Sequence, residues 1–237
     1  MKGMPKWFAC AVILALGATL AGCTAKAVDK GWELCYEPPE MQATEEQCSI
    51  TVYEFQDDRP EQAMVGCEYN AIGTIVERYQ TARPIAQVVT DAIVSNLEAQ
   101  GFTVVRSSGW NLSPDTLRSV ATELALGGKI RACWVERQPK NYGGTYIGYL
   151  GANMTSNINL HVVIASPSGK EILWEGDLVA SDTYRHDHAI FTDSMPKPQE
   201  MLENVLKEAV DQLATNLDIQ RAIRFEVRPM FGLAIDF

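Results

Sequence analysis

The sequence predicts a mixed α/β (α+β) domain, in which one mixed, largely antiparallel sheet carries two to three helices, among them a long C-terminal helix. Three patterns indicate this class. A helical pattern, a glycine and a strand follow one another over residues 84–105, a hairpin pattern covers 154–184, and an apolar stripe of helical period runs over 196–217. Hydrophobic residues make up 46% of the 237 residues, which suffices for a real core.

The first half of the domain is predicted as two strands, a helix and a third strand. Alternation of β-branched and aromatic residues indicates the strands, at 48–55, 64–77 and 102–105. The helix runs from Pro84 to Gln100, because Ile85, Val88, Ala92 and their neighbours recur at helical spacing. Gly101 suits the left-handed position just past its end.

The second half is predicted as a short helix, three strands and the C-terminal helix. Ser113-Pro114-Asp115 is typical of a helix start, so a short helix is expected from there to Gly127. Strands are expected at 129–137, 154–165 and 171–184, the last two joined at Ser166-Pro167-Ser168-Gly169. The long helix is expected over Pro196–Leu217, and the tail from Arg224 is expected to form a late edge strand or to dock on a partner.

The N-terminal residues predict a lipoprotein signal. Two lysines precede the apolar or small stretch from Trp7 to Ala21, which is too short to span a bilayer comfortably. The stretch ends in Leu20-Ala21-Gly22-Cys23, a bacterial lipobox in which Cys23 becomes the lipidated first residue. A plain signal peptide or a short membrane anchor with a chance cysteine is the alternative.

Three segments are therefore expected: a signal peptide at 1–22, a tether at 23–47 and a single domain at 48–237. Thr24 follows the lipidated cysteine. In Gram-negative lipoproteins an aspartate there commonly marks retention at the inner membrane, so the outer membrane is expected, with the domain in the periplasm or at the surface. The anchor makes the membrane one partner, and a second envelope protein is the other.

The charge balance argues against nucleic acid as a partner. The chain has 20 basic and 30 acidic residues, and residues 1–22 contain two lysines and no acid. The mature chain then has 18 basic against 30 acidic residues, a net charge of −12. Phosphate binding requires clustered Lys and Arg, and attraction to anionic lipid requires the same.

Four cysteines remain after the signal is removed and Cys23 is lipidated: Cys35, Cys48, Cys67 and Cys133. An even number in an exported chain predicts two disulfides, and the three possible pairings stay open. Cys35 with Cys48 and Cys67 with Cys133 is the preferred pairing. The spacing does not resemble a metal site.

The order of motifs resembles that of the YajG-like family of small bacterial lipoproteins. A lipobox leads to a strand that ends in Asp58-Arg59-Pro60, then to Gly101-Phe102-Thr103-Val104, to Cys133-Trp134-Val135 and to a hairpin turn at Pro167-Ser168-Gly169-Lys170. The resemblance covers about Ser49 to Leu217. It implies an outer-membrane lipoprotein with a mixed α/β domain, and it brings no catalytic residue.

Two stretches are candidates for a site. Tyr142, Tyr146 and Tyr149 lie among glycines and form the candidate interaction surface, because tyrosine is enriched where proteins bind proteins. His186 and His188 would share one face of a strand and are the only candidates for a metal. The plainer interpretation of the tyrosine stretch is a flexible hairpin tip, and that of the histidine stretch is a polar loop.

These patterns favour a non-catalytic, lipid-anchored envelope protein that acts as an assembly or binding accessory, with no cofactor. The sequence has no nucleophile elbow, P-loop or dinucleotide fingerprint, so an enzyme is not expected. A carrier of a small hydrophobic or lipid ligand, held between sheet and helix, is the first alternative. A metal-dependent hydrolase that uses His186 and His188 is the second.

Overall fold

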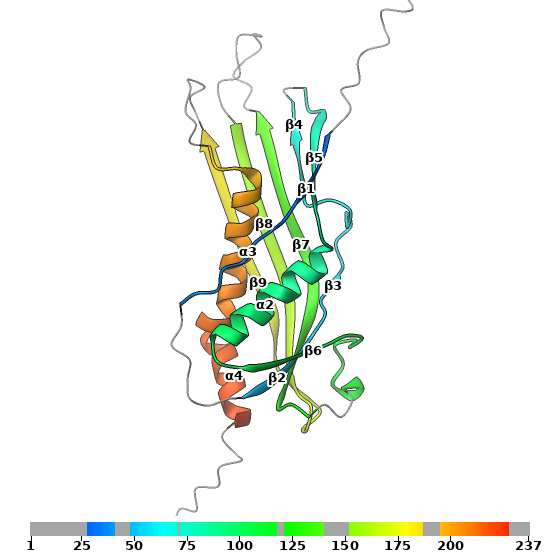
Figure 1. Cartoon of the computed structure of the whole chain (residues 1–237), viewed down its shortest axis with the longest axis vertical. Coiled ribbons are helices and arrows are strands. Elements are labelled where there is room, and N and C mark those ends of the chain that lie inside the picture. The colour runs from blue at the N-terminus through cyan, green and yellow to red at the C-terminus, as the bar shows by residue number, and fades with distance from the viewer. Residues whose placement is uncertain are drawn as a thin grey trace, which may run out of the picture.

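The protein forms one mixed sheet with helices on one face (Figure 1). The structure is a computed structural model, and it describes residues 28–40, 48–70, 72–117, 121–139, 152–186 and 195–227. The strands are β1 (Val28–Trp32), β2 (Ser49–Tyr53), β3 (Gln56–Asp57), β4 (Gly66–Tyr69), β5 (Ile75–Thr81), β6 (Thr103–Ser107), β7 (Leu124–Pro139), β8 (Ala152–Ser166) and β9 (Glu171–His186). The helices are α2 (Ile85–Ala99), the 3-10 turn η1 (Pro114–Thr116), α3 (Pro198–Thr215) and α4 (Leu217–Val227).

Strand β7 is the centre of the sheet. On one side it pairs antiparallel with β8, which pairs antiparallel with β9, and these are the longest pairings of the sheet. On its other side it pairs parallel with three short strands, β2, β3 and β4. Strands β6, β5 and β1 extend that side further. The predicted class, a mixed sheet with helices packed on it, is confirmed.

The core lies between the sheet and the three helices on its covered face. Helix α2 turns Val89 and Ile93 inward, and α3 adds Leu202 and Leu206, all of them fully buried. This space is where a carrier would need a groove, and these apolar side chains fill it.

Helix α2 ends as its sequence predicts. Gly101 has a φ of +94°, and its N–H donates to Glu98 O while the N–H of Phe102 donates to Leu97 O. These two bonds form a Schellman motif, which requires the left-handed backbone that glycine adopts without strain. The chain can therefore turn at once into β6.

The C-terminal helix of the prediction is in fact two helices. Helix α3 ends at Thr215, and the side-chain oxygen of Asn216 then accepts a hydrogen bond from the N–H of Asp218 at 2.9 Å. Asn216 thus caps the start of α4, as asparagine commonly does. The break allows Ile219 and Ile223 to reach the core. The expected strand in the tail is not seen over 224–227, which continue α4, and residues 228–237 lie outside the described part.

The second short helix that the sequence predicts over 113–127 is wrong. Among the described residues of this range, helical structure is limited to the single turn η1, and Leu124–Gly128 belongs to β7. Of the apolar residues in this pattern, Leu124 begins β7, whose first five residues are all buried, whereas Leu117 lies outside any helix or strand. Trp110 and Leu117, from the segment around η1, pack on the far face of the sheet against Ala125.

Residues 28–40 of the expected tether are part of the folded domain. Strand β1 pairs parallel with β5, and the Trp32 ring stacks on Tyr79 with centroids 4.4 Å apart. Trp32 and Leu34 are both buried in the main core. In the described part of the chain, no helix is long and apolar enough to cross a membrane.

Candidate functional site

Several of the predicted site residues lie outside the described part of the chain. These are the lipidation site Cys23, the candidate interaction residues Tyr142, Tyr146 and Tyr149, and the candidate ligand His188. His186 is the last residue of β9, and only its backbone is described. Among the described residues, no group of three or more His, Cys, Asp and Glu side chains could hold a metal ion.

The prediction of two disulfides is wrong, because Cys35, Cys48, Cys67 and Cys133 are all free. In the register of β4 and β7, Cys67 pairs with Glu136, three residues from Cys133. Three residues of strand cover about 10 Å, whereas disulfide-bonded Cα atoms lie about 4.4–6.8 Å apart.

The other preferred pair, Cys35 with Cys48, also lies on separate elements. The backbone N–H of Cys35 donates to Glu203 of α3 at 3.1 Å, whereas the buried Cys48 immediately precedes β2 and lies beside Glu123. The spacing of the cysteines in the sequence could not distinguish paired from free cysteines, since it does not show which strands become neighbours.

The three buried thiols are poor nucleophiles. Burial raises the pKa of Cys133 to about 12, and burial together with the Glu123 carboxylate raises the pKa of Cys48 to about 12. Burial also raises the pKa of Cys67. Because the thiolate is the reactive and metal-binding form, these side chains act as small apolar groups.

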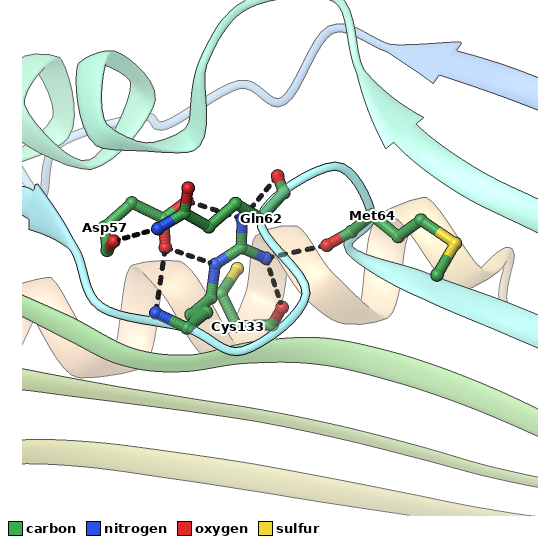
Figure 2. Close-up of polar contacts among 5 residues, drawn as sticks. Asp57, Gln62, Met64 and Cys133 are labelled. Carbon is green, nitrogen blue, oxygen red and sulfur yellow. Dashed lines mark hydrogen bonds and ion pairs between the residues drawn. The ribbon is translucent and has the colours of Figure 1, made fainter.

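Among the described residues, the most buried charged group is Arg59, in the segment between β3 and β4. Figure 2 shows the residues around it, Asp57, Gln62, Met64 and Cys133. Its Nε and Nη2 atoms each donate to a different carboxylate oxygen of Asp57, both at 2.8 Å. Nη1 donates to the carbonyls of Met64 at 2.8 Å and Cys133 at 3.1 Å, and Nη2 also donates to the carbonyl of Gln62 at 3.1 Å. The guanidinium is thus saturated inside the protein.

The Arg59 network joins two segments that are far apart in sequence. Asp57 ends β3, and Cys133 lies in the middle of β7, so the guanidinium fastens the loop after β3 to the central strand. Gln62 adds a bond from its side chain to Asp57 O at 2.6 Å. No donor of Arg59 is left for a ligand, so we assign this network a structural role. The sequence showed the signal as Asp58-Arg59-Pro60, where Asp57 stands two residues before Arg59.

A second charged cluster lies on the uncovered face of the sheet. His161 on β8 faces Asp177 on β9, with Nδ1 3.0 Å from Oδ1, and its Nε2 is 3.2 Å from Oε1 of Glu175. Arg131 on β7 donates from Nη1 to both oxygens of Asp177 at 2.8 Å. Each imidazole nitrogen of His161 thus contacts one carboxylate, that of Asp177 or that of Glu175.

The described partners of the His161 imidazole are two carboxylates, so this cluster does not pair it with a hydroxyl or thiol nucleophile. The His161 side chain is 14% exposed, whereas the side chains of Arg131 and Glu175 are about half exposed. Such pairs hold neighbouring strands in register and orient the imidazole, which is a structural task.

A third polar cluster joins the N-terminal segment to the helices. The Tyr36 hydroxyl donates to Asp211 Oδ1 of α3 at 2.7 Å and accepts from Asn96 Nδ2 of α2 at 2.7 Å. Burial, with a further contribution from the Asp211 carboxylate, raises the pKa of Tyr36 above its ordinary value. Lys207 lies over the Tyr36 ring at 5.6 Å and donates to Asp211 at 2.9 Å.

Comparison with known proteins gives structural likenesses only. No family model and no curated protein matches the chain, so the YajG-like resemblance stays a prediction. A Xanthomonas campestris protein of the DUF330 family is similar over 85% of this chain and 98% of its own, with 14% identity and a TM-score of 0.43. A neuraminyllactose-binding hemagglutinin homologue from Helicobacter pylori is similar over 82% and 96%, with 10% identity and a TM-score of 0.47.

A lipoprotein from Neisseria meningitidis is also similar, over 71% of this chain and 99% of its own. Its identity is 13% and its TM-score is 0.34. With TM-scores below 0.5, these three likenesses assign neither a family nor a function to this chain.

Proposed function

We propose that this chain is a lipid-anchored, non-catalytic envelope protein, held at the outer membrane through Cys23, where it serves as a binding or assembly accessory. The observation that carries the proposal is Leu20-Ala21-Gly22-Cys23 at the end of a short apolar segment. The YajG-like resemblance implies the same class.

Lipid chemistry supports a stable anchor. A diacylglyceryl group on the Cys23 sulfur and an acyl chain on its amine supply several chains, and each buried CH₂ contributes about 0.8 kcal/mol, so that several chains hold where one does not. The chain carries an excess of acids, so it gains no electrostatic attraction to anionic lipid, and the acyl chains must provide the anchor.

The polar clusters of the described residues are occupied in holding the fold together, which fits a non-catalytic domain. The donors of Arg59 are used by Asp57 and by backbone carbonyls, and His161 is held by Glu175 and Asp177. The Tyr36 hydroxyl is likewise shared between two helices. Each cluster satisfies its own members, which is typical of groups that specify a fold.

The anchor is tested by replacing Cys23 in the full chain, expressed in a Gram-negative bacterium. Cys23→Ser should abolish the lipid mass on the mature protein and move it out of the membrane fraction. Cys10→Ser is the matched control, because Cys10 lies in the same N-terminal segment and leaves with the signal. A Cys23→Ser chain that still carries the lipid mass and stays in the membrane fraction would overturn the proposal.

The choice of membrane is tested at the next residue. Thr24→Asp should move the protein from the outer-membrane to the inner-membrane fraction of a density gradient, and Thr24→Ser should not. If the unaltered protein sediments with the inner membrane, the outer-membrane part of the proposal fails and the anchor stands.

The partner is sought from the candidate interaction surface. A photo-crosslinking amino acid at Tyr146 in cells should give one discrete adduct with an envelope protein, which mass spectrometry identifies. The same substitution at Tyr36, which is engaged with Asn96 and Asp211, should not give it. The absence of any discrete adduct from positions 142, 146 and 149 would count against the accessory role.

A further inference from the structure

The folded domain begins only a few residues after the lipid attachment site. Cys23 and the first residue of β1, Val28, are five residues apart. Five residues of fully extended chain span at most about 18 Å. The end of the domain at which Val28 lies must therefore stay close to the bilayer when Cys23 is lipidated.

That end of the molecule also carries a hairpin turn. Strand β1 runs parallel to β5 with Val28 opposite Glu77, while β5 begins at Ile75. The β4–β5 turn therefore extends past Val28 on the side from which the chain enters (Figure 1). Pro139 of β7, Ala152 of β8 and His186 of β9 are in register at the same end.

The turn presents an apolar side chain to the outside. Ile72 is 77% exposed, the largest exposed fraction among the large apolar side chains of the described residues. The side-chain oxygen of Asn70 accepts from the N–H of Ile72 at 3.1 Å and from that of Thr74 at 2.9 Å. Gly73 closes the turn with a φ of +79°, which favours glycine.

We propose that the β4–β5 turn contacts the bilayer that holds the lipid anchor, with Ile72 in the lipid interface and the strands standing upright on the membrane. The occupant is lipid, because the five-residue link from Cys23 holds this end within about 18 Å of the bilayer. An acidic domain approaches such a surface through an apolar side chain more readily than through charge.

The opposite end of the sheet supplies a matched control position. Ile172, near the β8–β9 turn, is also an exposed isoleucine, at 41%. It lies fourteen residues along β9 from His186, which is about 46 Å of strand. In an upright domain Ile172 cannot reach the bilayer, whereas a domain lying flat would bring both isoleucines near it.

The test places a photo-crosslinking amino acid at position 72 or at position 172 of the full-length protein, in membranes of the expressing cells. After irradiation, phospholipid adducts are measured by mass spectrometry. Position 72 should give about tenfold more adduct than position 172, because about 46 Å separates the two ends. Equal yields, or more adduct at position 172, would overturn the proposal.

This inference rests on the proposed lipidation, and the two can fail separately. The mass of the mature protein and its membrane fractionation report the anchor before any irradiation. A lipidated, membrane-bound protein that gives no adduct at position 72 would contradict the orientation and leave the anchor intact. A protein without lipid on Cys23 would contradict the proposed function itself.

Discussion

Arg59 shows how one residue can decide the course of a loop. Its guanidinium is buried, with 4% of the side chain exposed, and it bonds to the Asp57 carboxylate and to three backbone carbonyls. Burying a charge is costly unless it is paired and hydrogen-bonded, and here both conditions are met. Removing the cation would leave the Asp57 carboxylate and three carbonyls without their donor.

We therefore expect Arg59→Met to lower the free energy of unfolding by about 3–5 kcal/mol, the cost of breaking a buried pair. Urea unfolding of the chain from Thr24 onward measures the change. Arg131→Met is the control, because Arg131 pairs with Asp177 at the surface, and exposed pairs contribute about 1 kcal/mol or less. Equal losses for the two variants would contradict a structural role for the Arg59 network.

Glu123 makes stability depend on pH. The N–H of Ser49 donates to its Oε2 at 2.7 Å, and this bond, followed by the interaction with Cys48, lowers the pKa of Glu123. A lowered folded-state pKa stabilises the fold above the ordinary carboxyl pKa of about 4.3, and the stabilisation is lost as pH falls through the folded-state value.

The urea midpoint of the unaltered chain should therefore fall as the pH is lowered from about 5 to about 3. The fall should be shallower in Glu123→Gln, which keeps an acceptor oxygen but cannot titrate. Midpoints measured at a series of pH values check this. Parallel curves for the two chains would show that Glu123 does not contribute.

At the scale of the element, a single bulge decides what His161 faces. The β8–β9 hairpin starts with Ser166 opposite Glu171, and an unbroken register from there would place His161 opposite Gly176. An irregularity between Ile164 and Ala165 shifts the pairing by one residue, so that Asp177 faces His161 instead. The hairpin and its turn were predictable from the sequence, but the bulge was not, so the charged cluster was missed.

Close packing around β7 gives a prediction for one glycine. A Cβ at Gly128 would collide with the carbonyl of His161 and with the Phe55 ring. Gly128→Ala should therefore cost about 1–3 kcal/mol of stability, as overpacked cores do. Gly31→Ala in β1 is the matched control, because a Cβ there has nothing within 4 Å. Thermal unfolding of both variants checks it, and similar melting temperatures would refute the close contact.

The elements that sequence predicted best are those with a strong local signal. The helix from Pro84 and its end at Gly101 depend on period and backbone chemistry, which are local. The segment after Ser113 was assigned wrongly because Leu124–Gly128 is buried on both faces, so it lacks the alternation of a strand. The role of β1 depends on pairing with β5, far away in the sequence, and no local pattern shows it.

At the scale of the whole molecule, the sheet with helices on one face follows from the order of apolar patterns. The disulfide prediction depends only on the expected export of the chain and on its even number of cysteines. The strand order separates Cys67 from Cys133, and all four cysteines are free. The candidate interaction surface at Tyr142, Tyr146 and Tyr149 depends on glycine-rich sequence without a period, and it stays a prediction.

The charge of the chain from Thr24 onward predicts how it behaves without a lipid anchor. Because this part has 18 basic and 30 acidic residues, it should not sediment with vesicles of anionic phospholipid at any salt concentration. Ile72 alone is too small an apolar surface to hold it there. Sedimentation of the lipidated chain with the same vesicles is the positive control, and salt-sensitive binding of the lipid-free chain would contradict the prediction.

Strand β9 has one further consequence. Within the described residues it pairs only with β8, so a strand of 16 residues presents an open edge, which is a template for aggregation. Gln212 of α3 occupies one edge carbonyl, that of Val179, at 2.9 Å, and acids such as Glu171 and Asp182 are spaced along the strand. These features protect the open edge from pairing with another chain, so we expect their loss to appear first as insoluble protein.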